Sequence, residues 1–101
     1  MKKNRETKNE FRKNNSKDAK GHPAYIYMKE GDEYLFLGLT HSPITKGVTN
    51  IKLDRNPNPS DLRPAYVRPR SGRAHKSQFG ARLKGWYFGK SDKQKISKLK
   101  K

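Results

Sequence analysis

Hydrophobic and polar residues alternate over two neighbouring segments in the first half of the chain. Residues 24–29 and 34–40 are rich in aliphatic and aromatic side chains, and the tetrapeptide Glu-Gly-Asp-Glu at 30–33 separates them. A period of two is typical of β-strands, and a short connection that contains glycine is typical of a hairpin. We therefore predict two antiparallel strands joined by a turn at residues 30–33.

Alternation divides the side chains of this hairpin between two faces. Ala24, Ile26 and Met28 share one face of the first strand, and the leucines at 35, 37 and 39 share one face of the second. Aromatic side chains occupy the opposite faces of both strands. They form either a platform on which unpaired bases stack, if the sheet is exposed, or a second buried face of the sheet. Because the chain is poor in aliphatic residues, we favour the buried face. The rings concerned are Tyr25, Tyr27, Tyr34 and Phe36.

Shorter segments extend the β-rich pattern. Residues 48–53 alternate, and residues 65–68 and 86–88 are rich in strand-forming side chains, so each predicts a strand. Prolines at 57 and 59 predict a turn-rich connection, because proline donates no main-chain hydrogen bond to a ladder. Residues 76–84 fit a short helix, although the glycine at position 80 disfavours it.

The C-terminal residues predict a short basic helix. Ser91 and Gln94 have the spacing of a capping box, which places Ser91 at the N-cap. Ile96 and Leu99 follow on one face, and the closing lysines suit the negative end of the helix dipole. Because a helix of this length is unstable alone, we expect its two apolar side chains to dock on the rest of the domain.

Basic residues are unevenly distributed along the 101 residues, whose formal net charge is +16. Residues 1–21 hold 8 basic and 3 acidic groups and few apolar residues, which predicts a disordered basic arm. Residues 22–61 hold 4 basic and 5 acidic groups, whereas residues 62–90 hold 8 basic groups and no acidic one. The expected organisation is the arm at 1–21, one β-rich domain at 22–90 and the helix at 91–101. The expected fold is mainly β, either a small compact barrel or a curled sheet.

The composition excludes several classes of protein. No apolar run approaches the ~18 residues of a membrane-spanning helix, and no secretory core follows the basic first residues. We therefore expect a cytoplasmic protein without a membrane partner. Cysteine is absent, and the 3 histidines do not have the spacing of a metal site. We expect neither a metal ion nor another cofactor.

The segment from Leu62 to Ser91 contains no acidic residue and interleaves cations with aromatic rings. Cations attract phosphates and release counterions, arginine binds a phosphate through two donors, and exposed rings stack on unpaired bases. These properties predict a nucleic-acid-binding face, with single-stranded RNA as the expected partner. A basic surface that serves solubility alone is the alternative. The predicted contact residues are Arg63, Arg68, Arg70, Arg73, Lys76, Arg82, Lys84 and Trp86.

A second group of residues has the chemistry of a ribonuclease site. His41 follows a predicted strand and lies between Thr40 and Ser42, and His22 precedes the first strand of the hairpin. An imidazole exchanges protons near neutral pH, and a hydroxyl bonds a phosphate oxygen. These four residues are the candidate catalytic set for cleavage through the 2′-hydroxyl. The alternative is that the hydroxyls stabilise the turn before Pro43 and that the imidazole bonds the main chain.

Two segments resemble motifs of PemK/MazF-type ribonuclease toxins. The sequence His-Pro-Ala-Tyr-Ile-Tyr at 22–27 resembles the Arg-Pro-apolar strand of that family. Residues 34–40 resemble its next apolar strand, which ends in an apolar-Thr-Ser turn. The resemblance implies a small SH3-like barrel that cleaves single-stranded RNA, with His22 and Thr40 at the positions of the catalytic Arg and Thr. It also implies an antitoxin, either protein or RNA, as a partner.

The chain departs from that family pattern at three places. His22 replaces the arginine, Gly38 replaces a proline, and His41 stands between Thr40 and Ser42. Residues 22–90 more loosely resemble small basic proteins of bacterial mobile elements, which implies a nucleic-acid context without a known activity.

The sequence thus predicts a small basic protein that binds nucleic acid, RNA above all, through the cations at 63–90. The alternative function is a metal-independent endoribonuclease. A second alternative is a ribosome-associated or structural protein in which the charge serves only for docking. Cleavage of labelled RNA in EDTA distinguishes the ribonuclease from the two binding functions.

Overall fold

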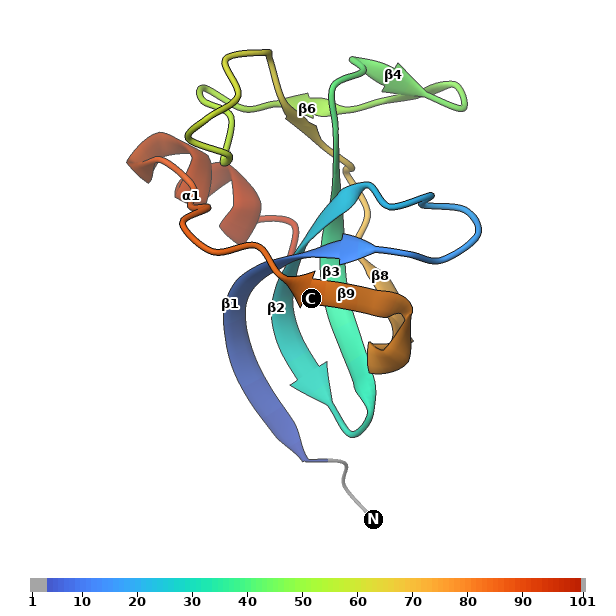
Figure 1. The fold of residues 1–101 in the computed structure, drawn as a ribbon. Helices are drawn as coiled ribbons and strands as arrows, with labels where there is room; N and C mark the ends of the chain where they lie inside the picture. Colours follow the sequence, from blue (N-terminus) through green and yellow to red (C-terminus); the bar gives the residue numbers. More distant parts are fainter. Residues whose placement is uncertain (1–3, 101) are drawn as a thin grey trace.

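The computed structural model describes residues 4–100, and β-strands make up most of its regular structure (Figure 1). The prediction of a mainly β fold with a short C-terminal helix is confirmed. In chain order the elements are β1 (Arg5–Asn14), β2 (Pro23–Glu30), β3 (Glu33–Thr40), β4 (Ile44–Thr45), β5 (Val48–Thr49), β6 (Ile51–Lys52), β7 (Tyr66–Val67), β8 (Gly72–His75), the 3₁₀ turn η1 (Lys76–Gln78), β9 (Phe79–Arg82) and α1 (Lys90–Ser97).

The predicted hairpin is confirmed as β2 and β3. The two strands pair antiparallel, with Ala24 opposite Gly38 at one end and Glu30 opposite Glu33 at the turn. Gly31 adopts a positive φ of 61° in that turn, a conformation that costs glycine little. The hairpin therefore has the connection that its sequence predicts.

The prediction that the four aromatic residues of the hairpin share one face is wrong. Opposite residues of an antiparallel pair project to the same side, and the register places Tyr25 opposite Leu37 and Ile26 opposite Phe36. Tyr25 and the leucines therefore belong to one core cluster, whereas Ile26 and Phe36 belong to another. The alternation of side chains along each strand does not determine which residues of the two strands pair. It therefore does not determine which side chains share a face of the sheet. The buried interpretation holds for the three tyrosines, whereas Phe36 is only partly buried.

Residues 5–14 form a full strand, so the prediction of a disordered arm at 1–21 is wrong there. β1 pairs with β2 on one edge and with β9 on the other. Phe11 is 3% exposed, and its ring lies 5.0 Å from that of Phe88 and 5.2 Å from that of Tyr25. Residues 15–21 form a hydrogen-bonded turn in which the Gly21 amide donates to the Asn14 carbonyl. Residues 1–3 of the predicted arm lie outside the described residues.

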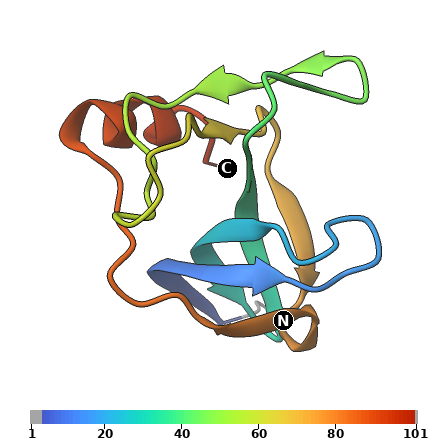
Figure 2. The ribbon, with the colours of Figure 1, turned by 45° about the horizontal axis from the view of Figure 1, so that its top comes forward.

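Both faces of the sheet are buried. The strand order is β6-β7-β3-β2-β1-β9, and β8 pairs with β3 as well. β8 and β9 therefore lie on opposite sides of the β2–β1 pair, and η1 connects them across the smaller core, which contains Ala24, Ile26, Tyr34 and Phe79. α1 and the loops beside it cover the larger core through Leu53, Phe88 and Ile96. The described strands form an open, curled sheet rather than a closed barrel (Figure 2).

Three shorter predictions need correction. The strand expected at 48–53 is split at Asn50, because β5 turns back on β4 while β6 pairs with β7. Residues 86–88 form no strand; Phe88 enters the larger core from an irregular segment. The helix expected at 76–84 is the 3₁₀ turn η1 followed by β9, whose pairing with β1 outweighs a helix that Gly80 disfavours. The strand expected at 65–68 is present as β7.

The C-terminal helix, Lys90–Ser97, begins two residues earlier than the capping box predicts. Gly89 is the N-cap and provides no side-chain cap, and the Ser91 hydroxyl instead donates to the Asp54 carboxylate. Ile96 is 1% exposed and docks on the core as expected, and Leu99 packs beside it. Residue 101 of the predicted helix lies outside the described residues. Among residues 4–100, no helix is long and apolar enough to cross a membrane.

Candidate nucleic-acid interface

An open groove of about 490 Å³ lies between the 15–22 loop, the β4–β5 hairpin and β8. Figures 1 and 2 show the loop and the hairpin on the same side of the sheet, opposite α1. Asp18 is the acidic residue of the lining, which also contains His22 and Thr40. The groove is therefore basic, with cations at Lys46, Arg68, Arg70 and Arg73.

Two glycines give this groove its shape. A Cβ atom at Gly72 would lie 2.7 Å from Cζ of Phe36, so only glycine lets the Phe36 ring lie against β8. A Cβ atom at Gly38 would lie 3.2 Å from Cγ of Arg68, whose side chain passes over β3 at that point. An aromatic ring and a guanidinium group are thereby both held along the lining of the groove.

Arg68 is fixed by the β4–β5 hairpin. Its Nη1 atom donates to Oδ1 of Asn50 at 2.9 Å and to the Thr45 carbonyl at 3.3 Å. Asn50 in turn donates to the Ser42 carbonyl at 2.9 Å and to Oγ1 of Thr45 at 2.8 Å. Both bonds of Arg68 use Nη1 and not the Nε or Nη2 donors. The guanidinium is therefore oriented in advance, with donors to spare.

The remaining cations of the groove differ in how far acidic groups offset their charge. Arg73 lies 3.0 Å from a Glu30 oxygen and 3.2 Å from a Glu33 oxygen, and these hydrogen bonds raise its pKa. Arg70 is exposed, and within residues 4–100 no ion pair to it or to Lys46 is found. Among residues 4–100, no acidic side chain therefore offsets the charge of Arg70 or Lys46, and the same holds for Arg68, whose partners are neutral.

The structure does not bring the other predicted contact residues into the groove. Arg63 binds Asp61 at 2.7 Å, and Lys76 lies 3.5 Å from Asp32 beside the β2–β3 turn. Arg82 lies on β9 opposite Arg12, Lys84 follows that strand, and the Trp86 ring packs 5.8 Å from Phe11. The acid-free segment therefore wraps around the molecule instead of forming one face.

Lys46 is the groove cation that the sequence analysis missed. It stands with Gly47 in the two-residue turn between β4 and β5, where both residues have positive φ angles, 50° and 77°. An x-Gly pair between short runs of strand-forming residues is a hairpin signal. Residues 44–49 contain that signal, although the alternating pattern predicts a strand only from residue 48 onward.

Three of the four candidate catalytic residues border one small cavity. His22, Thr40 and His41 line a space of about 40 Å³, and His22 and Thr40 also line the larger groove, so the two spaces adjoin. Ser42 is exposed and outside this lining. Its main-chain amide donates to Oγ1 of Thr40 at 3.2 Å, so the Thr40 hydroxyl takes part in the turn.

His41 is tied to the loop that precedes β7. Its Nδ1 atom lies 2.9 Å from the Pro64 carbonyl, which only accepts, so Nδ1 bears the proton. Its Nε2 atom lies 3.5 Å from Oδ2 of Asp61. The side chain and main-chain amide of Arg63 hold the pKa of Asp61 well below its usual range, and His41 adds to this. The imidazole therefore faces a carboxylate that stays ionised at neutral pH.

Within residues 4–100, no three imidazole or carboxylate groups come together as metal ligands. No family model, no curated protein and no solved structure matches this chain in the comparisons made, and the resemblance to ribonuclease toxins stays a prediction.

Proposed function

We propose that this protein binds single-stranded nucleic acid, RNA in the first place, in the groove beside Arg68 and Arg70. The observation that supports the proposal most is the convergence of three arginines and a lysine on one concave surface against a single aspartate. Phosphates bind such clusters of cations, and binding releases counterions. The volume of the groove, about 490 Å³, lies within the range of ligand sites in proteins.

The lining favours a single strand over a duplex. The partly exposed ring of Phe36 lies in the same groove as the Arg68 guanidinium. A flexible strand places a phosphate on a guanidinium and an unpaired base on a ring within one site, whereas a duplex keeps its bases stacked inside. The groove is therefore suited to a short stretch of unpaired nucleotides.

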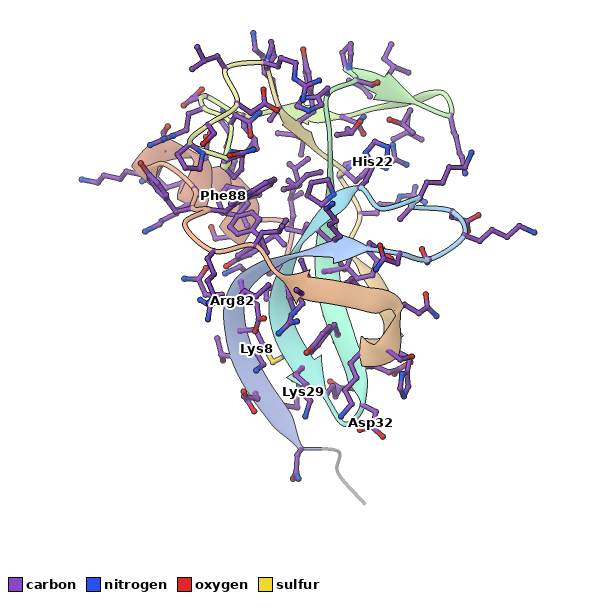
Figure 3. All side chains as sticks on the ribbon, viewed as in Figure 1. Lys8, His22, Lys29, Asp32, Arg82 and Phe88 are labelled. Atoms are coloured by element: carbon purple, nitrogen blue, oxygen red, sulfur yellow. The ribbon has the colours of Figure 1, made fainter. Side chains whose placement is uncertain are left out.

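The test is binding of fluorescein-labelled single-stranded RNA, followed by anisotropy. Arg70→Glu should weaken binding strongly, because it reverses an exposed charge in the groove. Lys29→Glu changes the net charge equally but lies at the far end of the β2–β3 hairpin from His22 (Figure 3), so it should have a much smaller effect. Equal losses in the two variants would indicate a non-specific effect of net charge and would reject the groove.

Salt dependence supplies the second readout. The logarithm of the association constant should fall linearly with the logarithm of salt, by about 0.7 for each phosphate neutralised on a single strand. Lys46→Ala should reduce that slope by about one phosphate contact. Charge reversal at Arg68 or Arg73 is a poorer test, because it would also disturb the fold. Arg68 donates a hydrogen bond to Asn50, and Arg73 donates to Glu30 and Glu33.

A second candidate function is cleavage of the bound RNA, and the shared cavity of His22, Thr40 and His41 favours it. In such a reaction one imidazole removes the proton of the 2′-hydroxyl, and the 2′-oxygen attacks phosphorus. The bond from phosphorus to the 5′-oxygen breaks, and the leaving oxygen takes a proton from the second imidazole. The products are a 2′,3′-cyclic phosphate and a 5′-hydroxyl, and the groove cations stabilise the charge on the phosphate.

Purified protein, incubated with labelled single-stranded RNA in EDTA, tests this candidate. Cleavage by the wild type should fall about 10²–10⁴-fold in His41→Ala, while RNA affinity stays nearly constant. A preparation of Arg70→Glu from the same protocol controls for contaminating nuclease, since it should lose activity through binding. RNA that stays intact between about pH 5 and 9 rejects cleavage and leaves the binding function.

A further inference from the structure

Tyr87 is the most exposed aromatic side chain among residues 4–100, with 48% of its surface accessible. It follows Trp86 and precedes Phe88, and both of these rings pack on the larger core. Packing of the core therefore accounts for its two neighbours but not for Tyr87. An exposed ring on a basic protein is a candidate contact for an unpaired base.

The Tyr87 ring is held in one position by Arg55. The guanidinium carbon of Arg55 lies 4.3 Å from the ring centroid, and Nη1 donates to the tyrosine hydroxyl at 2.7 Å. The Tyr87 amide donates to the Pro57 carbonyl at 3.1 Å, and the Arg55 amide donates to the buried Asp92 carboxylate at 3.1 Å. The two side chains form a stack that is anchored through both main chains. Because both side chains are already held in place, a base that stacks on them causes little further loss of side-chain entropy.

The surroundings of the stack favour an anionic chain. Lys84 and Lys90 flank Tyr87 in sequence and are exposed. Asp54, the acidic residue next to Arg55, is already bonded by the Ser91 hydroxyl and by Lys95, whose ammonium lies 3.0 Å away. The net charge that a ligand meets here is therefore positive.

The small cavity lies between the groove and the stack. The groove shares His22 and Thr40 with the small cavity, and that cavity is also lined by Pro57 and Trp86. Pro57 is buried and accepts the hydrogen bond of the Tyr87 amide, whereas Trp86 is partly exposed and precedes Tyr87 in the chain. Asp61 also lines this cavity, and Arg63 pairs with its carboxylate at 2.7 Å. His22 and Phe88 also lie toward the same end of the molecule, away from Lys29 (Figure 3).

We infer that a single strand bound in the groove continues past His22 and Trp86 and stacks a base on the Arg55–Tyr87 pair. This inference rests on the proposed function and extends it from a phosphate-binding groove to a track for several nucleotides. The expected ligand is an unpaired RNA or DNA strand that is longer than the groove alone accommodates. Neither the hairpin at 44–49 nor β8 takes part in this second contact.

The experiment compares a short and a long oligouridylate, of about 3 and about 12 nucleotides, in anisotropy titrations. Tyr87→Ala should weaken binding of the long strand about fivefold or more and leave the short strand unaffected, because only the long strand reaches the stack. Tyr87→Phe keeps the ring and should retain most of the affinity. Melting temperatures of both variants establish that each is folded.

The outcomes separate the two proposals. If Arg70→Glu weakens both oligonucleotides while Tyr87→Ala changes neither, the track is overturned and the groove stands. If Tyr87→Ala weakens both lengths equally, its effect is not that of a distant stacking contact, and the track is again overturned. If Arg70→Glu changes neither affinity, the proposed function fails regardless of Tyr87.

Discussion

The carboxylate of Asp92 accepts a hydrogen bond from the main-chain amide of Asp54 at 2.7 Å, across 38 positions of the sequence. Its second oxygen accepts from the Arg55 amide at 3.1 Å, and the side chain is 0% exposed. Asp92 lies in the first turn of α1, so one buried acid attaches the helix to the loop after β6. The Arg55–Tyr87 stack depends on this attachment.

Asp92→Ala should lower the free energy of unfolding by about 2–4 kcal/mol, because two main-chain amides lose their acceptor and a buried site is left unfilled. Chemical unfolding in urea measures the change. The control is Asp32→Ala, which removes an exposed carboxylate 3.5 Å from Lys76 and should change stability by less than about 0.5 kcal/mol. Equal unfolding midpoints for wild type and Asp92→Ala would show that the contact contributes nothing.

Phe11→Ala should cost about 3–5 kcal/mol, since it removes a buried ring from contact with three others. Deletion of residues 1–14 should therefore prevent folding, in contrast to the removal of a disordered arm. Lys13 on the same strand is exposed, and Lys13→Ala therefore serves as the control. Thermal unfolding of the substitutions and amide dispersion of the deletion check these expectations, and a dispersed spectrum from the deletion would contradict them.

Gly72→Ala should destabilise the protein by about 1–3 kcal/mol, because the new methyl group overlaps the Phe36 ring. In a Phe36→Leu background the same change should cost less, since the smaller side chain leaves room. A double-mutant cycle in urea measures this coupling. Additive effects of the two substitutions would mean that the backbone, and not the ring, restricts position 72.

Thr40→Val should lower the melting temperature by a few degrees, because the Ser42 amide loses its acceptor at 3.2 Å. The cost of one such bond is about 0.5–1.5 kcal/mol. Thr40→Ser retains the hydroxyl and should recover most of the loss. Differential scanning calorimetry measures the melting temperatures of the three proteins. An unchanged melting temperature in Thr40→Val would show that the bond to the Ser42 amide does not stabilise the turn and that the wild-type hydroxyl is available to a phosphate.

The stability that Asp61 contributes should depend on pH in the acidic range. Its pKa is lowered in the folded protein, first by the Arg63 side chain and then by the Arg63 amide. The contribution is therefore fully present above the unfolded pKa of about 3.9 and is lost as the pH falls toward the folded value. The stability difference between wild type and Asp61→Asn should shrink between about pH 5 and 2. A difference that is constant over this range would contradict the assigned contacts.

Features that depend on short-range geometry could be predicted from the amino-acid sequence alone. The period of two and the Glu-Gly-Asp-Glu turn predicted the β2–β3 hairpin, and the spacing of Ile96 and Leu99 predicted the two side chains by which α1 and the turn after it dock on the core. The density of cations predicted that Arg68, Arg70 and Arg73 would serve the basic surface, and all three line the groove. The hairpin and the docked side chains depend on neighbours a few positions away, which a single sequence displays, whereas the groove combines distant segments.

Which segments come into contact depends on the folded chain as a whole. β1 has one large apolar residue, Phe11, and its polar sequence resembles a disordered arm until β2 and β9 satisfy its main chain on both edges. Register between β2 and β3 divided the aromatic residues between two cores, because pairing, not alternation, sets which side chains share a face. Arg63, which pairs with Asp61 two positions away, lies outside the groove, whereas Lys46 lines it because the β4–β5 hairpin meets the 15–22 loop and β8. Contacts of this kind are set by the packing of the whole chain, and no local pattern encodes them.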